Sequence, residues 1–290
     1  MSQRLKIILD TSAINALEDG EMLSEPLMKA LELGYDVRLT AMSADEIVAI
    51  AKNPDRRDAL LRRFSRLLVN APCIWPPNEV IRLHVRAFHQ SPSAYDWHKV
   101  YVRAEEYERA FSSRALPLEI SDEQRAVHFT LEKQFQGAWK SLRPKLDEII
   151  KRNPHQKLRT FDEAAEACVK PGGVLWGFGA GLYAHAFDSD RPEITDEQVK
   201  PFIEVCPPFR ATCYSFVKAW FSYSLSPTHV NIPKAGRNDL MMATYLPYGD
   251  IFLTNDYAQR LDLTDIARVA QIPCDVTPFE QFSNSFNINH

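Results

Sequence analysis

Residues Leu5 to Ala13 read Leu-Lys-Ile-Ile-Leu-Asp-Thr-Ser-Ala, an apolar run that stops at a carboxylate and two small polar residues. A short apolar run rich in β-branched residues, ended in this way, predicts a buried parallel strand that leads into a loop. Packing alone does not explain an acidic residue at the end of a buried strand. Ligands of open α/β sheets bind beyond the carboxyl ends of the strands. Asp10 is therefore the first candidate for a functional residue.

Length and composition are those of an ordinary globular protein. The chain has 290 residues, of which 45% are hydrophobic and 25% charged, and its formal net charge is −4. No global basic field marks it as a nucleic-acid binder, although local basic patches can suffice. The five cysteines form no C-x-x-C motif, which favours buried thiols over a zinc or disulfide framework. With no apolar leader and no membrane-length apolar run, we expect a cytoplasmic protein with no membrane partner.

The hydrophobic pattern divides the chain into two kinds of region. Near both ends, strand patterns at 35–40, 71–75 and 250–254 and around Cys274 alternate with helical patterns. This alternation predicts an α/β fold with a central parallel sheet. Between these ends the pattern is almost entirely helical and rich in aromatic residues, so it should bury a core. We predict a discontinuous α/β domain at 1–75 and 231–290, with an all-α insertion domain at 76–230.

Individual helices of this pattern have recognisable starts. Asn53-Pro54 combines a favoured N-cap residue with proline at the first helical position. Ser43 and Glu46 form a capping-box pattern, which would explain Glu46 without any functional role. Another helix opens near Ser121 and should end or kink at Pro144. The apolar stripe expected on that helix comprises Val127, Leu131, Phe135, Ala138 and Leu142.

Basic side chains gather in two places. On the helix that follows Asn53, three arginines lie opposite the apolar face: Arg62, Arg63 and Arg66. A second basic stretch runs from Lys140 to Arg159. A solvated surface explains either cluster, and the functional alternative is contact with nucleic-acid phosphates.

Four carboxylates occupy comparable places along the chain. Asp10 and Asp256 follow predicted strands, whereas Glu46 and Asp239 fall near the starts of predicted helices. Each alone has an ordinary explanation, because acids stabilise helix N-termini and begin loops. Parallel βαβ topology, however, brings all four to one edge of the sheet. Carboxylates that meet there raise one another's pKa unless a cation offsets their charge, and oxygen ligands favour Mg²⁺ or Mn²⁺.

The segments that carry these acids resemble, in the same order, the four acidic motifs of PIN-domain nucleases. The matching segments are Ile-Leu-Asp10-Thr-Ser, Ser-Ala-Asp-Glu46-Ile, Asn-Asp239-Leu-Met-Met-Ala and Leu-Thr-Asn-Asp256. Asp45 stands beside Glu46, so the identity of the second acid stays open. The resemblance covers residues 1–75 and 231–290, and the long helical region between the second and third motifs departs from small members of the family.

The resemblance implies a PIN-like three-layer α/β/α fold and an endoribonuclease, with a toxin or a defence effector as its candidate roles. It assigns Asp10 and Asp256 as principal ligands of one or two Mg²⁺ or Mn²⁺ ions. Asp239 would share a metal, and Glu46 would either ligate or orient the attacking water. Three hydroxyls would orient the carboxylates: those of Thr11, Ser12 and Thr254. An acidic pocket repels phosphate, so flanking cations would hold the RNA, with Arg62, Arg63 and Arg66 as candidates.

Other functions compete with this one. A structure-specific DNA nuclease shares the general fold, and only cleavage assays separate it from a ribonuclease. A non-catalytic RNA-binding protein with a relic site is disfavoured because all four acids are present. A phosphatase or receiver-like protein would need a second Asp where Ser12 stands. The RNA target and a homodimer stay open, and the long insertion argues against transferring an antitoxin partner.

Overall fold

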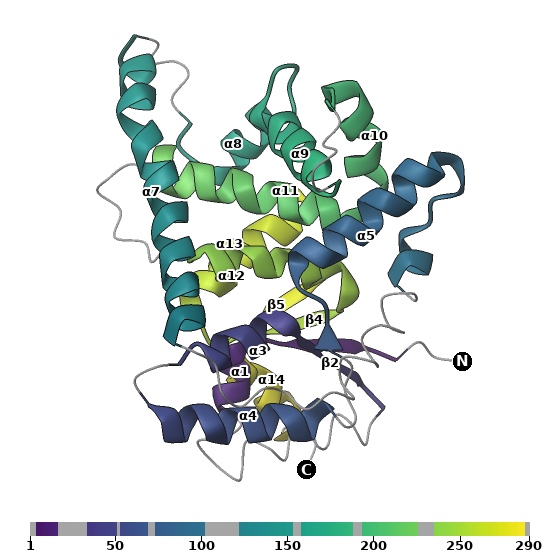
Figure 1. Cartoon of the computed structure of the whole chain (residues 1–290), viewed down its shortest axis with the longest axis vertical. Helices are drawn as coiled ribbons and strands as arrows, with labels where there is room; N and C mark the ends of the chain where they lie inside the picture. Colours follow the sequence, from purple (N-terminus) through teal and green to yellow (C-terminus); the bar gives the residue numbers. More distant parts are fainter. Residues whose placement is uncertain are drawn as a thin grey trace.

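A central sheet of five parallel strands organises the molecule (Figure 1). The computed structural model describes residues 4–16, 34–50, 53–68, 73–101, 122–152, 158–187, 193–225 and 235–287. The strands are β1 (Lys6–Leu9), β2 (Asp36–Thr40), β3 (Cys73–Ile74), β4 (Ile251–Leu253) and β5 (Asp275–Thr277). Their order across the sheet is β3-β2-β1-β4-β5. The predicted α/β class with a parallel sheet is confirmed.

The strand order joins the two ends of the chain. The central strand β1 pairs with β2 on one side, where Ile7 lies opposite Val37, and with β4 on the other, where Ile8 lies opposite Phe252. Because all pairs are parallel, the carboxyl ends of β1, β2 and β4 lie next to one another. Segments more than 200 residues apart in sequence therefore meet at one edge of the sheet.

Helices cover both faces of the sheet. In chain order they are α1 (Thr11–Ala16), α3 (Ala41–Val48), α4 (Pro54–Leu68), α5 (Pro77–Gln90), the 3-10 turn η1 (Pro92–Ala94), α7 (Asp122–Arg152), α8 (Phe161–Cys168), α9 (Val174–His185), α10 (Asp196–Val205), α11 (Pro207–Trp220), the π-helical turn η3 (Phe221–Leu225), α12 (Arg237–Met241), the 3-10 helix η4 (Met242–Tyr248), α13 (Tyr257–Val269) and α14 (Phe279–Asn287). None of the described helices combines the length and apolar composition that a membrane crossing requires.

One face of the sheet packs against α1, α4 and α14 (Figure 1). Strand residues such as Leu9 and Leu39 share this core with Phe64 and Phe279. Asn53 caps α4 as predicted, because its side chain accepts a hydrogen bond of 3.0 Å from the Arg56 N–H. The apolar face of α4 is buried here, as its periodicity predicts.

The opposite face shares its core with the long helical region. A second cluster of buried residues includes Ile8 and Phe252 from the sheet and continues without a break into Phe202 and Phe209 of the inserted helices. The division of the chain into two domains stays a prediction. The described residues show that the helices of 76–230 use this face of the sheet as part of their core. All five cysteines are buried free thiols, as expected.

One helix begins earlier than predicted, and another continues past the proline that was expected to end or kink it. The capping box at Ser43 does not form, because α3 begins earlier: the Thr40 hydroxyl caps it by accepting from the Ser43 N–H at 3.1 Å. In addition, α7 does not end at Pro144 but continues to Arg152.

The apolar stripe predicted on α7 is also wrong. Val127 is 53% exposed, whereas Trp139 is a buried residue of this helix. The helix contacts the molecule through positions 132, 135, 136 and 139, and the exposed residues of the predicted stripe are Val127, Leu131, Ala138 and Leu142. The helix α7 lies at the margin of the molecule (Figure 1), and most of its described side chains are exposed. Hydrophobic periodicity predicted a helix here but not which of its side chains are covered.

Candidate functional site

Asp10 follows β1 directly and is 3% exposed. Its Oδ2 accepts hydrogen bonds from the Ser12 N–H at 3.1 Å, from the Ser12 hydroxyl at 2.8 Å and from the Thr254 hydroxyl at 3.1 Å. Burial raises the pKa of Asp10, and the hydrogen bonds from Ser12 and Thr254 act in the opposite direction. Two of the three hydroxyls singled out in the sequence thus fix one oxygen of this carboxylate.

Glu46 lies within α3 and is held by the third of these hydroxyls. The Thr11 hydroxyl donates to Glu46 Oε2 at 2.6 Å. Burial and the negative charges of Asp10 and Asp239 together raise the pKa of Glu46 to about 8. Asp45, the alternative second acid, is exposed. Glu46 is therefore the acid of this pair that faces Asp10, and it does not cap its helix.

Asp239 lies in the first turn of α12, where it accepts a hydrogen bond of 2.8 Å from the Gly236 N–H. Burial raises the pKa of Asp239 to about 7, and the nearby charges of Asp10, Asp256 and Glu132 contribute in the same direction. The mutual effects of Asp10, Glu46 and Asp239 show that these three carboxylates share one site at the carboxyl edge of the sheet.

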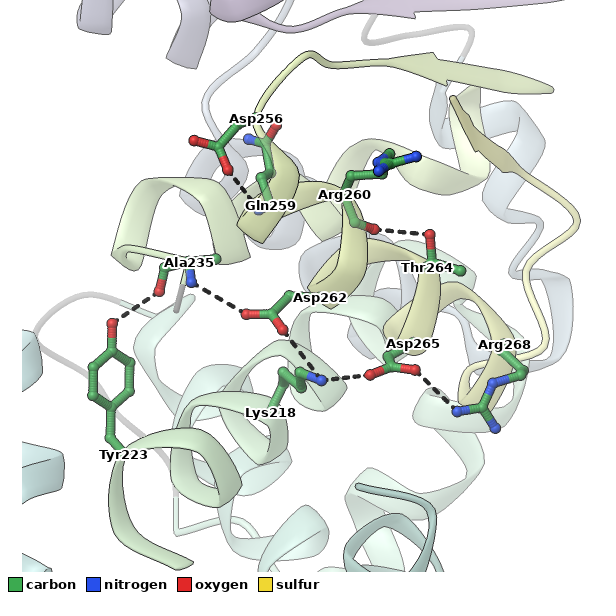
Figure 2. Close-up of polar contacts among 10 residues, drawn as sticks. All are labelled: Lys218, Tyr223, Ala235, Asp256, Gln259, Arg260, Asp262, Thr264, Asp265 and Arg268. Atoms are coloured by element: carbon green, nitrogen blue, oxygen red, sulfur yellow. Dashed lines mark hydrogen bonds and ion pairs between the residues drawn. The ribbon is translucent and has the colours of Figure 1, made fainter. Parts of the chain in front are cut away.

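Asp256 lies at the margin of this site. It is exposed, and its Oδ1 accepts a hydrogen bond of 2.8 Å from the Gln259 N–H, so that it caps α13 (Figure 2). Its charge raises the pKa of Asp239, so the two carboxylates are neighbours. Three of the four predicted acids therefore share one site. The fourth, Asp256, lies at its margin and caps α13.

Gln259 is a member of the site that the sequence analysis missed. It is fully buried, and its Nε2 lies 3.5 Å from Asp10 Oδ1 and 3.3 Å from Asp239 Oδ1. Its Oε1 is buried without a hydrogen-bond partner within the described part of the chain. The amide N–H groups thus bridge two carboxylates. Gln259 stands three residues after Asp256, a spacing that marks a helix start but not this second role.

Glu132 is the other residue that was missed, and it comes from the long helical region. From α7, its Oε2 accepts a hydrogen bond of 2.7 Å from the Arg237 N–H at the start of α12, and its Oε1 accepts one of 2.7 Å from Gln136. The neighbouring Gly236 N–H is held by Asp239. Two consecutive backbone groups of α12 are therefore held by two carboxylates, one of them supplied by α7.

Ala235, two residues before α12, is held in place as well (Figure 2). The Ala235 N–H donates to Asp262 at 3.3 Å, and the Ala235 carbonyl accepts from the Tyr223 hydroxyl at 2.9 Å. Asp262 in turn forms a buried ion pair of 3.2 Å with Lys218 of α11. These contacts fix where α12 begins and therefore where Asp239 lies.

The basic residues proposed to hold RNA lie on α4. Arg62 is exposed and Arg63 is partly exposed, whereas the side chain of Arg66 lies outside what the structure describes. Their role in binding RNA stays a prediction.

The donor set of the site suits a hard cation, although the geometry is not that of a ready-made metal centre. Among the described residues, no three His, Cys, Asp or Glu side chains converge as a metal-binding group. The acids here offer only oxygen donors, which Mg²⁺ and Mn²⁺ prefer. Burial and like charge raise the pKa of Glu46 and of Asp239, and a bound cation would reverse the effect of like charge.

Comparisons of the chain with protein-family models, with curated proteins and with solved structures gave no match. The order of the acidic motifs and the geometry of the site therefore carry the functional argument.

Proposed function

We propose that this chain is a metal-dependent ribonuclease with a PIN-like fold that cleaves RNA endonucleolytically. The observation that carries the proposal is the meeting of Asp10, Glu46 and Asp239 at the carboxyl edge of a parallel sheet, with raised pKa values for all three. Clustered carboxylates with strongly perturbed pKa values mark functional sites more often than structural ones. A cytoplasmic location belongs to the same proposal.

Asp10, Glu46 and Asp239 would hold Mg²⁺ or Mn²⁺, with Asp256 beside them. When bound, such an ion stabilises the negative charge that develops during phosphodiester hydrolysis and lowers the pKa of water. The hydroxyls of Thr11, Ser12 and Thr254 fix the orientation of the carboxylates that they contact. Gln259 holds Asp10 and Asp239 in a fixed relation through its amide. Such supporting contacts typically change metal affinity or activity by about 10- to 100-fold.

A cleavage assay on total RNA and on single-stranded DNA, with Mg²⁺ or Mn²⁺, tests the proposal. We expect wild-type protein to cleave RNA and Asp10→Asn to abolish cleavage, because the variant removes a ligand charge. Its thermal unfolding temperature should not fall, since the substitution removes a buried charge. Asp275→Asn is the matched control, because Asp275 is exposed at the amino end of β5, the opposite edge of the sheet.

The assay also separates the competing functions. Undiminished cleavage by Asp10→Asn would contradict the site assignment. Cleavage of DNA alone would establish the structure-specific DNA nuclease instead. Absence of metal-dependent cleavage on either substrate would favour the RNA-binding protein with a relic site, a function that agrees with the lack of a ready-made metal-binding group among the described residues.

A further inference from the structure

A cavity of about 370 Å³ lies among five helices next to the candidate site. The helices α5, α7, α9 and α11 form most of its wall, and Arg237 and Met241 of α12 close it. Its volume falls within the range of small-ligand pockets, about 300–1,000 Å³. Four of these five helices belong to the long helical region, so this region forms most of the cavity wall.

A smaller cavity of about 160 Å³ also lies against the start of α12. Residues that line both cavities are Pro77, Asn78, Arg237 and Met241. The smaller one is also lined by Met42 of α3 and by Asn238, the residue before Asp239. The side chain of Asn238 hydrogen-bonds to Glu46. The larger cavity and the carboxylate site therefore share one element, because Arg237 and Asp239 both belong to α12.

The wall of the larger cavity combines aromatic rings with basic groups. Phe135 of α7 and Phe216 of α11 are partly exposed aromatic residues in this wall. Arg82, His185 and Arg237 supply basic groups, and Glu79, which pairs with Arg82, is the acid among the lining residues. A guanidinium carries five N–H groups, so the bond of 3.1 Å from Arg237 to Asn238 leaves donors for a ligand.

This combination fits a nucleotide better than other ligands. Unpaired bases bind proteins by stacking on aromatic side chains, and arginine binds phosphate through paired N–H groups. A purely apolar ligand would make no use of the basic groups in the wall. An acidic peptide would use the basic groups but would leave unexplained why the cavity lies beside the proposed site of phosphodiester hydrolysis.

We propose that this cavity binds one unpaired nucleotide of the RNA substrate, with its base against Phe135 and Phe216 and its phosphate near Arg82 and Arg237. The proposal rests on the proposed ribonuclease function and specifies its substrate as single-stranded at this position. The long helical region would then select the RNA, while the sheet edge would cleave it.

Binding of mononucleotides tests the cavity without relying on cleavage. The four ribonucleoside 5′-monophosphates are titrated into Asp10→Asn protein by calorimetry. We expect at least one to bind, and Phe135→Leu to weaken it by at least about fivefold through lost stacking. Because Phe135 also contacts Trp139, Arg82→Gln provides a second variant at a partly exposed position. Arg268→Gln is the matched control, since Arg268 also forms an ion pair three residues along its helix but lies at the far end of α13 (Figure 2).

The titration overturns the cavity proposal in either of two ways. No binding of any mononucleotide at millimolar concentration would contradict it. Binding that both cavity variants leave unchanged would place the nucleotide elsewhere and would contradict it equally. The four 2′-deoxynucleoside 5′-monophosphates are titrated in the same way. If they bind more tightly than the ribonucleotides, the assignment of RNA is contradicted.

Cleavage kinetics separate this proposal from the function on which it rests. The second substrate is bis(4-nitrophenyl) phosphate, a small phosphodiester without a nucleobase. Phe135→Leu and Arg82→Gln should raise KM for RNA at least about fivefold and leave hydrolysis of the small substrate unchanged. Equal effects on both substrates, or none on either, would contradict the cavity proposal. If wild-type protein hydrolyses neither substrate, the proposed function fails, and the titration still decides whether the cavity binds nucleotides.

Discussion

Glu46 lies in the middle of a short helix, and a hydroxyl from a different element holds its carboxylate. Thr11→Val removes this hydroxyl at nearly constant volume and leaves Glu46 without the hydrogen bond of 2.6 Å. We expect cleavage at limiting Mn²⁺ to fall by about 10- to 100-fold, because a supporting contact to a proposed ligand is lost. The measurement is a Mn²⁺ titration of RNA cleavage, in which the half-maximal concentration should rise.

Two further variants make the test of Thr11 specific. Thr11→Ser keeps the hydroxyl and should retain most of the activity. Thr264→Val removes a hydroxyl that bonds only within α13, to the Arg260 carbonyl at 2.8 Å, and should leave the Mn²⁺ dependence unchanged (Figure 2). An unaltered Mn²⁺ titration for Thr11→Val would contradict a supporting role for this hydroxyl.

The acids and hydroxyls of the site were visible in the sequence because they lie near the ends of predicted strands or the starts of predicted helices, although the structure places Glu46 in the middle of α3. Gln259 was not, because a neutral side chain gives no charge signal and its spacing from Asp256 is that of an ordinary helix start. Glu132 was hidden for a different reason. It lies on a helix whose orientation against α12 depends on tertiary packing, which no local pattern encodes.

Among the elements, the start of α12 decides where Asp239 lies. Glu132→Ala removes the acceptor of the Arg237 N–H, and leaving such a group unsatisfied costs about 1–3 kcal/mol when it is buried. We expect a lower free energy of unfolding and a fall in kcat of about 10- to 100-fold, because the displaced helix misplaces Asp239. Chemical denaturation and steady-state kinetics measure the two effects.

The conservative variant shows whether Glu132 acts through position or through charge. Glu132→Gln keeps an oxygen that can accept from Arg237, so it should retain stability and kcat close to those of wild type. Glu148→Ala, at an exposed acid on the same helix, is the matched control and should behave as wild type. If Glu132→Gln were as inactive as Glu132→Ala, Glu132 would act through its charge rather than as a positioning residue.

The elements themselves were largely predictable, and their boundaries and faces were not. The inner strands β1 and β4 matched apolar runs, because burial on both faces leaves a strong signal in sequence. The start of α3 was misplaced since both Thr40 and Ser43 are good caps, and the choice is made by the end of β2, which leads directly into the helix. The face of α7 was misplaced because periodicity does not reveal how little of a marginal helix is covered.

At the scale of the whole molecule, the described helices of 76–230 and the sheet share one core. An apolar helix face shows that a helix packs but not against what, so the sequence pattern did not predict this sharing. His84 is one residue that connects these helices to the chain segments around the sheet. From α5, its Nε2 lies 2.7 Å from the hydroxyl of Tyr248 in η4, and its Nδ1 lies 2.7 Å from that of Tyr95. The imidazole thus links the long helical region to the segment that precedes β4.

This buried imidazole makes the stability of the whole molecule sensitive to acid. Burial lowers the pKa of His84 to about 3 from its ordinary value of 6.5. The folded state therefore holds His84 neutral, whereas the unfolded chain binds a proton below pH 6.5. This contribution to stability is fully present above pH 6.5 and is lost as the pH falls toward 3. Between pH 7 and pH 4 the loss amounts to about 3 kcal/mol, at 1.36 kcal/mol per pKa unit.

Chemical denaturation between pH 7 and pH 4 measures this loss when wild type is compared with His84→Gln. Glutamine does not titrate and can hydrogen-bond to both tyrosine hydroxyls, so the variant should lack the His84 contribution to acid sensitivity. The comparison also removes the opposing effect of Glu46 and Asp239, whose raised pKa values favour the folded state at lower pH. The exposed His98 provides the control, since His98→Gln should follow the wild-type profile. Parallel profiles for wild type and His84→Gln would show that this buried link does not govern acid stability.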